Sequence, residues 1–97
     1  MSIPPVTRNV NRNTMQIVTT GTQSTAGQMI SAIRSGLTIA LHFEDLDKPC
    51  GIAVFCTSIE EARKAYSKHK AGWQQWMLAS YPSEELNDYK QVAIGWV

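Results

Sequence analysis

The segment LTIALHF, residues 37–43, decides the fold class because large apolar side chains stand at every second position along it. A period of two is typical of a β-strand that buries one face. We therefore predict a strand here, with the other row of side chains facing outward. Continued by one residue, that outward row is Thr38, Ala40, His42 and Glu44.

A second strand follows at residues 51–57, GIAVFCT, which form a continuous apolar run rich in β-formers. The seven residues between the strands, EDLDKPC, contain acids, a lysine and a proline, a composition typical of a loop. A β-hairpin is the simplest connection between two such strands. Phe55 is the aromatic residue of the second strand that could face outward, where a base could stack on it.

Before the deciding segment, apolar residues recur from Ala26 to Ile33 at the spacing of one helix face. Thr22 or Ser24 is a suitable N-cap, and Gly36 can adopt the left-handed conformation that ends a helix. The earlier run MQIVTT, residues 15–20, is β-branched and apolar, which indicates a first strand.

A second helix is predicted from Ser58, because Ser58-Ile-Glu-Glu61 is a capping box. Its buried face is expected to carry residues at helical spacing that extend past a candidate break at Gly72. These residues are Ile59, Ala62, Tyr66, His69, Trp73, Trp76 and Met77.

Pro82 stops any further helix, and residues 83–85 can cap one short turn. Residues 89–97, YKQVAIGWV, predict a last strand with Val92, Ile94 and Trp96 on one side. The predicted order is therefore β-α-β-β-α-β.

This order favours an α+β fold of the ferredoxin-like type, a two-layer sandwich of an antiparallel sheet. Right-handed crossovers would then place both helices on one face of the sheet and leave the outward row on the open face. Ninety-seven residues suffice for one such core and not for two. We expect a single domain over residues 15–97, preceded by a flexible arm over residues 1–14 that contains two prolines and three asparagines.

The formal net charge is +1, so the overall charge does not indicate a particular class of binding partner. Residues 1–43 carry three arginines and no acid, whereas residues 44–97 carry six basic and eight acidic side chains. Arg8 and Arg12 make the predicted arm mildly basic, which leaves open a nucleic-acid-binding role for the arm together with the open sheet face. No signal peptide or apolar span is evident, so we expect a cytoplasmic protein with no membrane partner.

No catalytic or metal-binding signature is present. The chain lacks a Walker loop, a dinucleotide fingerprint, a nucleophile elbow and a zinc-protease motif. His42 and His69 have no ligand spacing, and Cys50 and Cys56 would be about 20 Å apart on one extended strand, too far to pair. We expect no enzyme activity, no metal and no cofactor.

The three tryptophans, Trp73, Trp76 and Trp96, are the first candidates for the core because they offer the most area to bury. Trp73 and Trp76 are also candidate interface anchors, and the sequence leaves both roles open. Small domains without a signature are common among regulatory, adaptor and inhibitor proteins, including those of phages and other mobile elements. We therefore predict a non-enzymatic module that docks a protein partner or self-associates, through the open sheet face, an edge strand or the segment from Gly72 to Tyr81. The predicted binding residues are Trp73, Trp76, Gln74, His42, Thr38, Phe55, Arg8 and Arg12.

Overall fold

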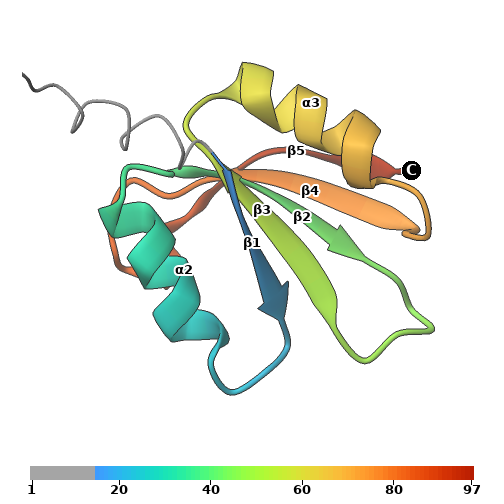
Figure 1. Ribbon diagram of the computed structural model, residues 1–97, viewed down its shortest axis with the longest axis horizontal. Helices are drawn as coiled ribbons and strands as arrows, with labels where there is room; N and C mark the ends of the chain where they lie inside the picture. The colour runs from blue at the N-terminus through green and yellow to red at the C-terminus, as the bar shows by residue number, and fades with distance from the viewer. Residues whose placement is uncertain (1–14) are drawn as a thin grey trace, which may run out of the picture.

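The computed structural model describes residues 15–97, which form an α+β domain with a five-stranded antiparallel sheet and two α-helices (Figure 1). In chain order the elements are β1 (Met15–Thr20), α2 (Thr25–Arg34), β2 (Ile39–Glu44), β3 (Gly51–Cys56), α3 (Ile59–His69), β4 (Gln75–Ser80), the 3₁₀ helix η1 (Leu86–Asp88) and β5 (Lys90–Trp96). The predicted α+β class is confirmed. The predicted arm, with Arg8 and Arg12, lies outside the described residues.

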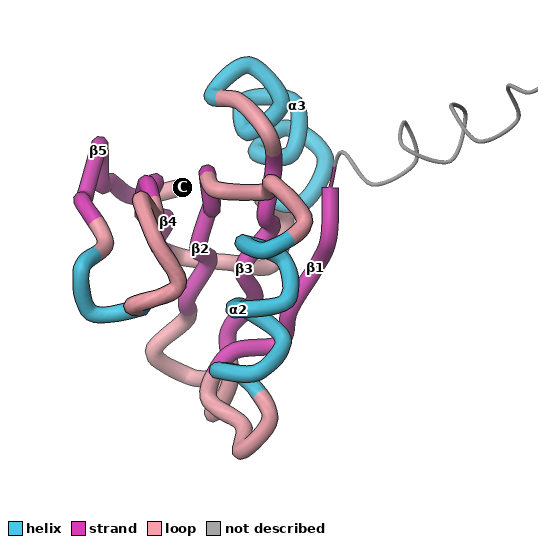
Figure 2. The backbone as a smooth tube through the Cα atoms, turned by 90° about the vertical axis from the view of Figure 1, so that its left-hand side faces the viewer, coloured by secondary structure: helices cyan, strands magenta, loops and turns pink. Residues whose placement is uncertain are grey.

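The order of strands across the sheet is β1-β3-β2-β4-β5, and every neighbouring pair is antiparallel. β1 and β5 therefore form the two edges, as Figure 2 shows. The run β1-β3-β2 matches the ferredoxin-like arrangement, but β4 pairs with β2 instead of returning beside β1, and β5 is an additional strand. The ferredoxin-like order is therefore not confirmed.

This strand order places the two helices on opposite faces of the sheet (Figure 1). The crossovers β1-α2-β2 and β3-α3-β4 step across the sheet in the same direction, yet they start from antiparallel strands. Right-handed crossovers of that kind leave from opposite faces. The prediction of both helices on one face is wrong because it assumed that the second crossover steps back toward β1.

Each face of the sheet has its own apolar core, as expected when alternate residues of a strand point to opposite sides. Below α2, the buried residues include Val18, Met29, Ile33, Ala53 and Phe55. Below α3, they include Leu41, Phe43, Val54, Ala62 and Leu78. Both sides of the central strands are thus covered.

The outward row predicted from residues 37–43 does not lie on an open face. Ala40 is fully buried and His42 is half-buried, because both lie on the side that α2 covers. Thr38 is half-buried, and its carbonyl oxygen accepts the Tyr81 backbone N–H at 2.8 Å. Only Glu44, at the end of β2, is exposed.

Helix α3 begins as predicted and ends earlier than predicted. The Glu61 backbone N–H donates to Ser58 Oγ at 3.2 Å, while the Glu61 carboxylate accepts the N–H of Thr57 at 3.0 Å. The helix ends at His69, and Gly72 follows with φ of +88°, a conformation that glycine adopts without strain. The assignment of Trp73, Trp76 and Met77 to this helix is therefore wrong, and Trp76 and Met77 belong to β4.

Lys48 links the loop after α3 to the β2–β3 hairpin through side-chain contacts. Its ammonium group donates to the Gly72 carbonyl oxygen and lies 4.3 Å from the centre of the Trp73 ring. Asp45 Oδ2 is 3.8 Å from the same nitrogen. These contacts hold the start of β4 beside the end of β2.

Candidate protein-binding surface

The strands β4 and β5, with the side chains that they carry, form a wing that the helices cover incompletely. α2 packs mainly on β1 and β3, and α3 packs mainly on β2 and β3. Figure 2 shows both helices gathered toward the β1 end of the sheet, with β4 and β5 standing clear of them. We refer to this region as the β4–β5 wing. Its exposed surface consists of a groove and a strand edge.

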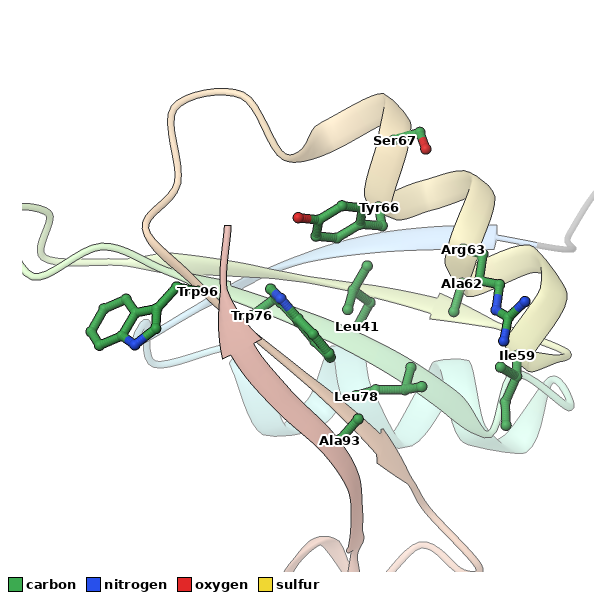
Figure 3. Close-up of a pocket in the computed structure, with 10 residues that line it drawn as sticks. All are labelled: Leu41, Ile59, Ala62, Arg63, Tyr66, Ser67, Trp76, Leu78, Ala93 and Trp96. Atoms are coloured by element: carbon green, nitrogen blue, oxygen red, sulfur yellow. The ribbon is translucent and has the colours of Figure 1, made fainter.

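The groove lies between α3 and the wing and has a volume of about 640 Å³ (Figure 3). Its floor comes from the sheet, and its wall comes from α3, with Ile59 and Tyr66 facing the sheet side. The floor residues are Leu41, Trp76, Leu78 and Ala93. A cavity of this size with a mostly apolar lining is in the range that binding pockets occupy.

Trp76 forms the central part of the floor, and its position depends on Gly95. The two residues are opposite one another in the β4–β5 pair. A side-chain carbon at residue 95 would come within 3.0–3.1 Å of the indole ring, so the ring lies against the bare backbone of β5. Tyr66 packs edge-on against the other side of the indole, with ring centroids 6.0 Å apart. Trp76 is therefore held as a half-buried platform.

Arg63 is the charged residue of the groove lining. Its side chain is exposed and lies along the wall of α3 near Ile59 (Figure 3). The rest of the lining is apolar apart from Ser67, whose hydroxyl points away from the sheet. The groove thus offers a largely apolar surface with one guanidinium group at its side.

The strand edge of the wing carries exposed apolar residues at alternate positions of β5. Val92 is 49% exposed, Ile94 60% and Trp96 70%. Trp96 also lines the open end of the groove, whereas Ile94 pairs with Met77 and lies on the α2 side of the sheet, so the groove and the exposed row meet at Trp96. The expectation that Trp96 belongs to the core is wrong.

The backbone of β5 also presents unpaired groups to solvent. The Val97 N–H donates to the Gln74 carbonyl oxygen at 2.9 Å, the bond expected at a hydrogen-bonded position of the ladder, while the Gln74 N–H donates to the Glu44 carbonyl oxygen. Because such positions alternate along an antiparallel ladder, Ile94 and Trp96 turn their N–H and C=O groups away from β4. β5 is the edge of the sheet in the described part of the chain, so these groups face open space.

Two of the predicted binding residues support the structure of the loops. Trp73 is half-buried and packs against Phe43 with ring centroids 6.4 Å apart. Gln74 accepts the Leu46 N–H through its side-chain oxygen at 3.0 Å. Both residues stabilise the corner beneath the wing, and neither lines the groove.

Phe55 is fully buried in the core below α2, where its ring lies 5.5 Å from that of Tyr81. The prediction that it could face outward is wrong, because α2 covers that face of β3. Among the predicted binding residues that the structure describes, Trp76 lies in the groove, and His42 lines a small pocket of about 90 Å³ beside Ile94 of the strand edge. Arg8 and Arg12 lie outside the described residues, so the structure does not place them.

His42 is joined to Tyr81 by a hydrogen bond of 2.9 Å between Nε2 and the phenol oxygen. Burial lowers the pKa of His42 from its ordinary 6.5 to about 4, so the imidazole is neutral at pH 7. Burial, together with the nearby Tyr89, raises the pKa of Tyr81 to about 12. A neutral pair in a packed interior is a structural element, and it lies apart from the groove.

Neither cysteine is in a disulfide. Burial, with a smaller contribution from the Glu61 charge, raises the pKa of Cys56 to about 11, which disfavours the reactive thiolate. Within residues 15–97, no group of three or more His, Cys, Asp or Glu side chains is placed to hold a metal ion. The helices of this region are also too short and too polar to cross a membrane.

Comparison with known proteins gave no match, either to a family model or to a curated protein or solved structure.

Sequence reasoning missed the exposed row on β5 as a binding surface, although its signal was present. The alternation places Val92, Ile94 and Trp96 on one side of the strand, but it does not say whether that side faces the core, and Trp96 alone is predicted there. The information needed to choose between core and surface was the position of β5 in the sheet, which depends on long-range pairing.

Proposed function

We propose that this chain is a non-enzymatic protein-binding module that docks an extended partner segment along the edge of β5. The observation that carries the proposal is the exposed row of Val92, Ile94 and Trp96 on an edge strand. Addition of a strand to a sheet edge is a common mode of peptide recognition, in which backbone hydrogen bonds supply affinity and side-chain contacts supply specificity.

Two further features support this edge as a binding surface. Sheet edges are usually protected by charged residues, proline or β-bulges. Residues 91–97 contain no charged side chain and no proline, and the one irregularity of the β4–β5 pair lies toward the start of β5, beside Val92. The groove adjoins the edge at Trp96 and can receive apolar side chains of the partner segment on the Trp76 platform. Tryptophan is enriched among the residues that contribute most to binding energy.

The described residues favour a protein partner over nucleic acid. Base recognition on a sheet needs exposed aromatic side chains and positive charge nearby. Phe55 is buried and β1 contains no aromatic residue. Trp96 is an exposed aromatic residue, but residues 91–97 carry no charged side chain that could contact phosphate. We therefore rank nucleic-acid binding below protein binding as the proposed function of this surface.

A displayed library of random peptides, selected against the full 97-residue chain at low density, tests the proposal without knowledge of the natural partner. We expect selected peptides to carry apolar residues at alternate positions and to lose binding to the variant Ile94→Lys. The matched control is Ile17→Lys, because Ile17 is 52% exposed and lies on the opposite edge strand β1. Selected peptides should bind this control as they bind the unmodified chain.

Two results would contradict the proposal. One is the absence of any enriched peptide. The other is enrichment of peptides whose binding is lost in Ile17→Lys and unaffected in Ile94→Lys, which would place the binding edge on β1.

A further inference from the structure

We propose that the β5 edge pairs with the β5 edge of a second copy of this chain, in antiparallel register about a two-fold axis at Ile94. This inference rests on the proposed function, because it names the partner of the same edge. It joins two five-stranded sheets into one continuous ten-stranded sheet.

The backbone of β5 limits the possible registers, and we choose the one with Ile94, the central residue of the exposed row, on the axis. Ile94 and Trp96 are the residues whose N–H and C=O groups face the open edge, as the Val97 to Gln74 hydrogen bond establishes. Two identical strands related by a two-fold axis perpendicular to the sheet are antiparallel. With Ile94 on the axis, Ile94 faces Ile94 of the second copy and the two residues exchange both backbone hydrogen bonds.

The same register brings favourable side chains together. Trp96 of each copy stands opposite Val92 of the other, two residues on either side of the axis; Val92 lies where the register of β5 with β4 shifts, between Leu78 and Ala79. Aromatic and β-branched residues directly opposite one another stabilise a strand pair by about 0.2–1 kcal/mol. The exposed row of one copy thus continues into the exposed row of the other.

Charge selects a second copy over a charged partner. Residues 91–97 carry no charged side chain, so an acidic or basic segment gains no ion pair on this strand. The one charged residue of β5 is Lys90, at its start. In the proposed register the two Lys90 residues lie at opposite ends of the paired strands, roughly 25 Å apart, where their repulsion is largely screened.

The opposite edge strand is less suited to self-pairing. On β1, Ile17 is an isolated exposed apolar residue, and its neighbour two positions on is the polar Thr19. β1 therefore presents no continuous apolar row. The same contrast makes Ile17 the matched control for Ile94.

The available area predicts a weak dimer. The exposed parts of Val92, Ile94, Trp96 and Val97 amount to roughly 400 Å² per copy, given that one aromatic side chain presents about 150–250 Å². Stable dimers bury about 800 Å² per partner, so this pairing should depend on concentration. It belongs to the class of small, reversible interfaces.

The mass of the full chain, measured by sedimentation from about 10 µM to about 1 mM, tests the inference, since that range covers the affinities of small interfaces. We expect the average mass to rise toward that of a dimer. Ile94→Lys should abolish the rise because two buried ammonium groups would face each other on the axis. Ile17→Lys should leave it unchanged.

A cysteine substitution tests the register. In a background with Cys50→Ser and Cys56→Ala, the variant Ile94→Cys should form an intermolecular disulfide under mild oxidation, because the facing Cα atoms are about 5.5 Å apart in such a pair. Val92→Cys alone should not, whereas a mixture of Val92→Cys and Trp96→Cys should give a mixed dimer. Ile17→Cys in the same background is the control and should remain unlinked.

The outcomes separate the two proposals. A chain that stays monomeric near 1 mM, while selected peptides still bind the β5 edge, overturns self-pairing and leaves the protein-binding function in place. A monomer that binds no peptide overturns both. A dimer that Ile17→Lys disrupts as strongly as Ile94→Lys overturns the assignment to β5.

Discussion

The two halves of the sheet differ in how they are covered. In the half formed by β1, β3 and β2, helices lie on both faces, and five of the six residues of β3 are buried. In the β4–β5 wing, none of the seven residues of β5 is buried. One antiparallel sheet thus contains a strand that belongs wholly to the interior and a strand that belongs to the surface.

The difference indicates a division of roles between the halves. Burial of apolar area is the main source of folding free energy, so the covered half should determine stability. In the β4–β5 wing, β5 keeps its large apolar side chains exposed at a cost in solubility, which is typical of surfaces that bind. Substitutions in the two halves should therefore have effects of different kinds.

The largest effect should come from Phe55→Ala in the covered half. Removal of a fully buried aromatic ring leaves a cavity below α2, and such changes cost about 3–5 kcal/mol of unfolding free energy. Ile94→Ala, on the edge of the wing, should change it by no more than about 0.5 kcal/mol. Urea denaturation at low protein concentration, where association is absent, measures both. Equal losses in the two variants would refute the division between the halves.

A somewhat smaller effect is expected from pH, again in the covered half. His42 has a pKa of about 4 when folded and about 6.5 when unfolded, so the unfolded chain binds more protons between these values. The stabilisation is fully present above pH 6.5 and is lost as the pH falls toward 4. Its maximum is roughly 3 kcal/mol, from 1.36 kcal/mol per pKa unit.

The comparison with His42→Gln isolates this contribution, because the carboxylates that titrate in the same range are common to both proteins. We expect the unfolding free energy of the unmodified chain to fall more steeply than that of the variant between pH 6.5 and 4. Parallel curves for the two proteins would show that His42 is not held neutral by the fold. Measurement of the His42 pKa by NMR gives an independent reading.

Much of the local structure could be predicted from the sequence, because its signals lie within a few residues. The alternation in residues 37–43, the capping box at Ser58 and the glycine after α2 each predicted an element that the structure contains. Gly36 has φ of +93°, as the end of a helix requires. These features depend on neighbours in the chain and on little else.

The β4 strand was missed because two patterns overlap there. Tyr66, His69, Trp73 and Trp76 are spaced like one face of a helix, so the period of α3 continues past its true end. Gly72 breaks the backbone without interrupting that spacing. Short apolar segments cannot be assigned to helix or strand by periodicity alone.

The candidate surface was harder to predict because it depends on the order of strands. Whether β4 lies beside β1 or beside β2 is decided by pairing between distant segments, and no local motif encodes it. The pairing of β4 with β2 places α3 on the second face of the sheet and β5 at an edge. It also leaves Ala40 and Phe55 buried below α2. Trp96 was accordingly expected in the core, although it is the most exposed of the β5 row.

The smallest effects should come from a pair of glycine substitutions, one in each half. Gly51→Ala adds a carbon that would overlap the Phe43 carbonyl oxygen in the covered half, and such overpacking costs about 1–3 kcal/mol. Gly95→Ala meets only the Trp76 ring, at 3.0–3.1 Å, and that half-buried ring can move toward the groove. The change in unfolding free energy should stay below about 1 kcal/mol, since alanine also lowers the backbone entropy of the unfolded chain.

Thermal unfolding compares the two glycine variants, and tryptophan fluorescence of Gly95→Ala reports the movement of Trp76. We expect a changed emission spectrum with little loss of stability for Gly95→Ala, and the reverse for Gly51→Ala. A loss at residue 95 as large as that at residue 51 would mean that the wing is packed as tightly as the covered half. In that case the Trp76 platform is fixed, and a partner would have to fit the groove as it stands.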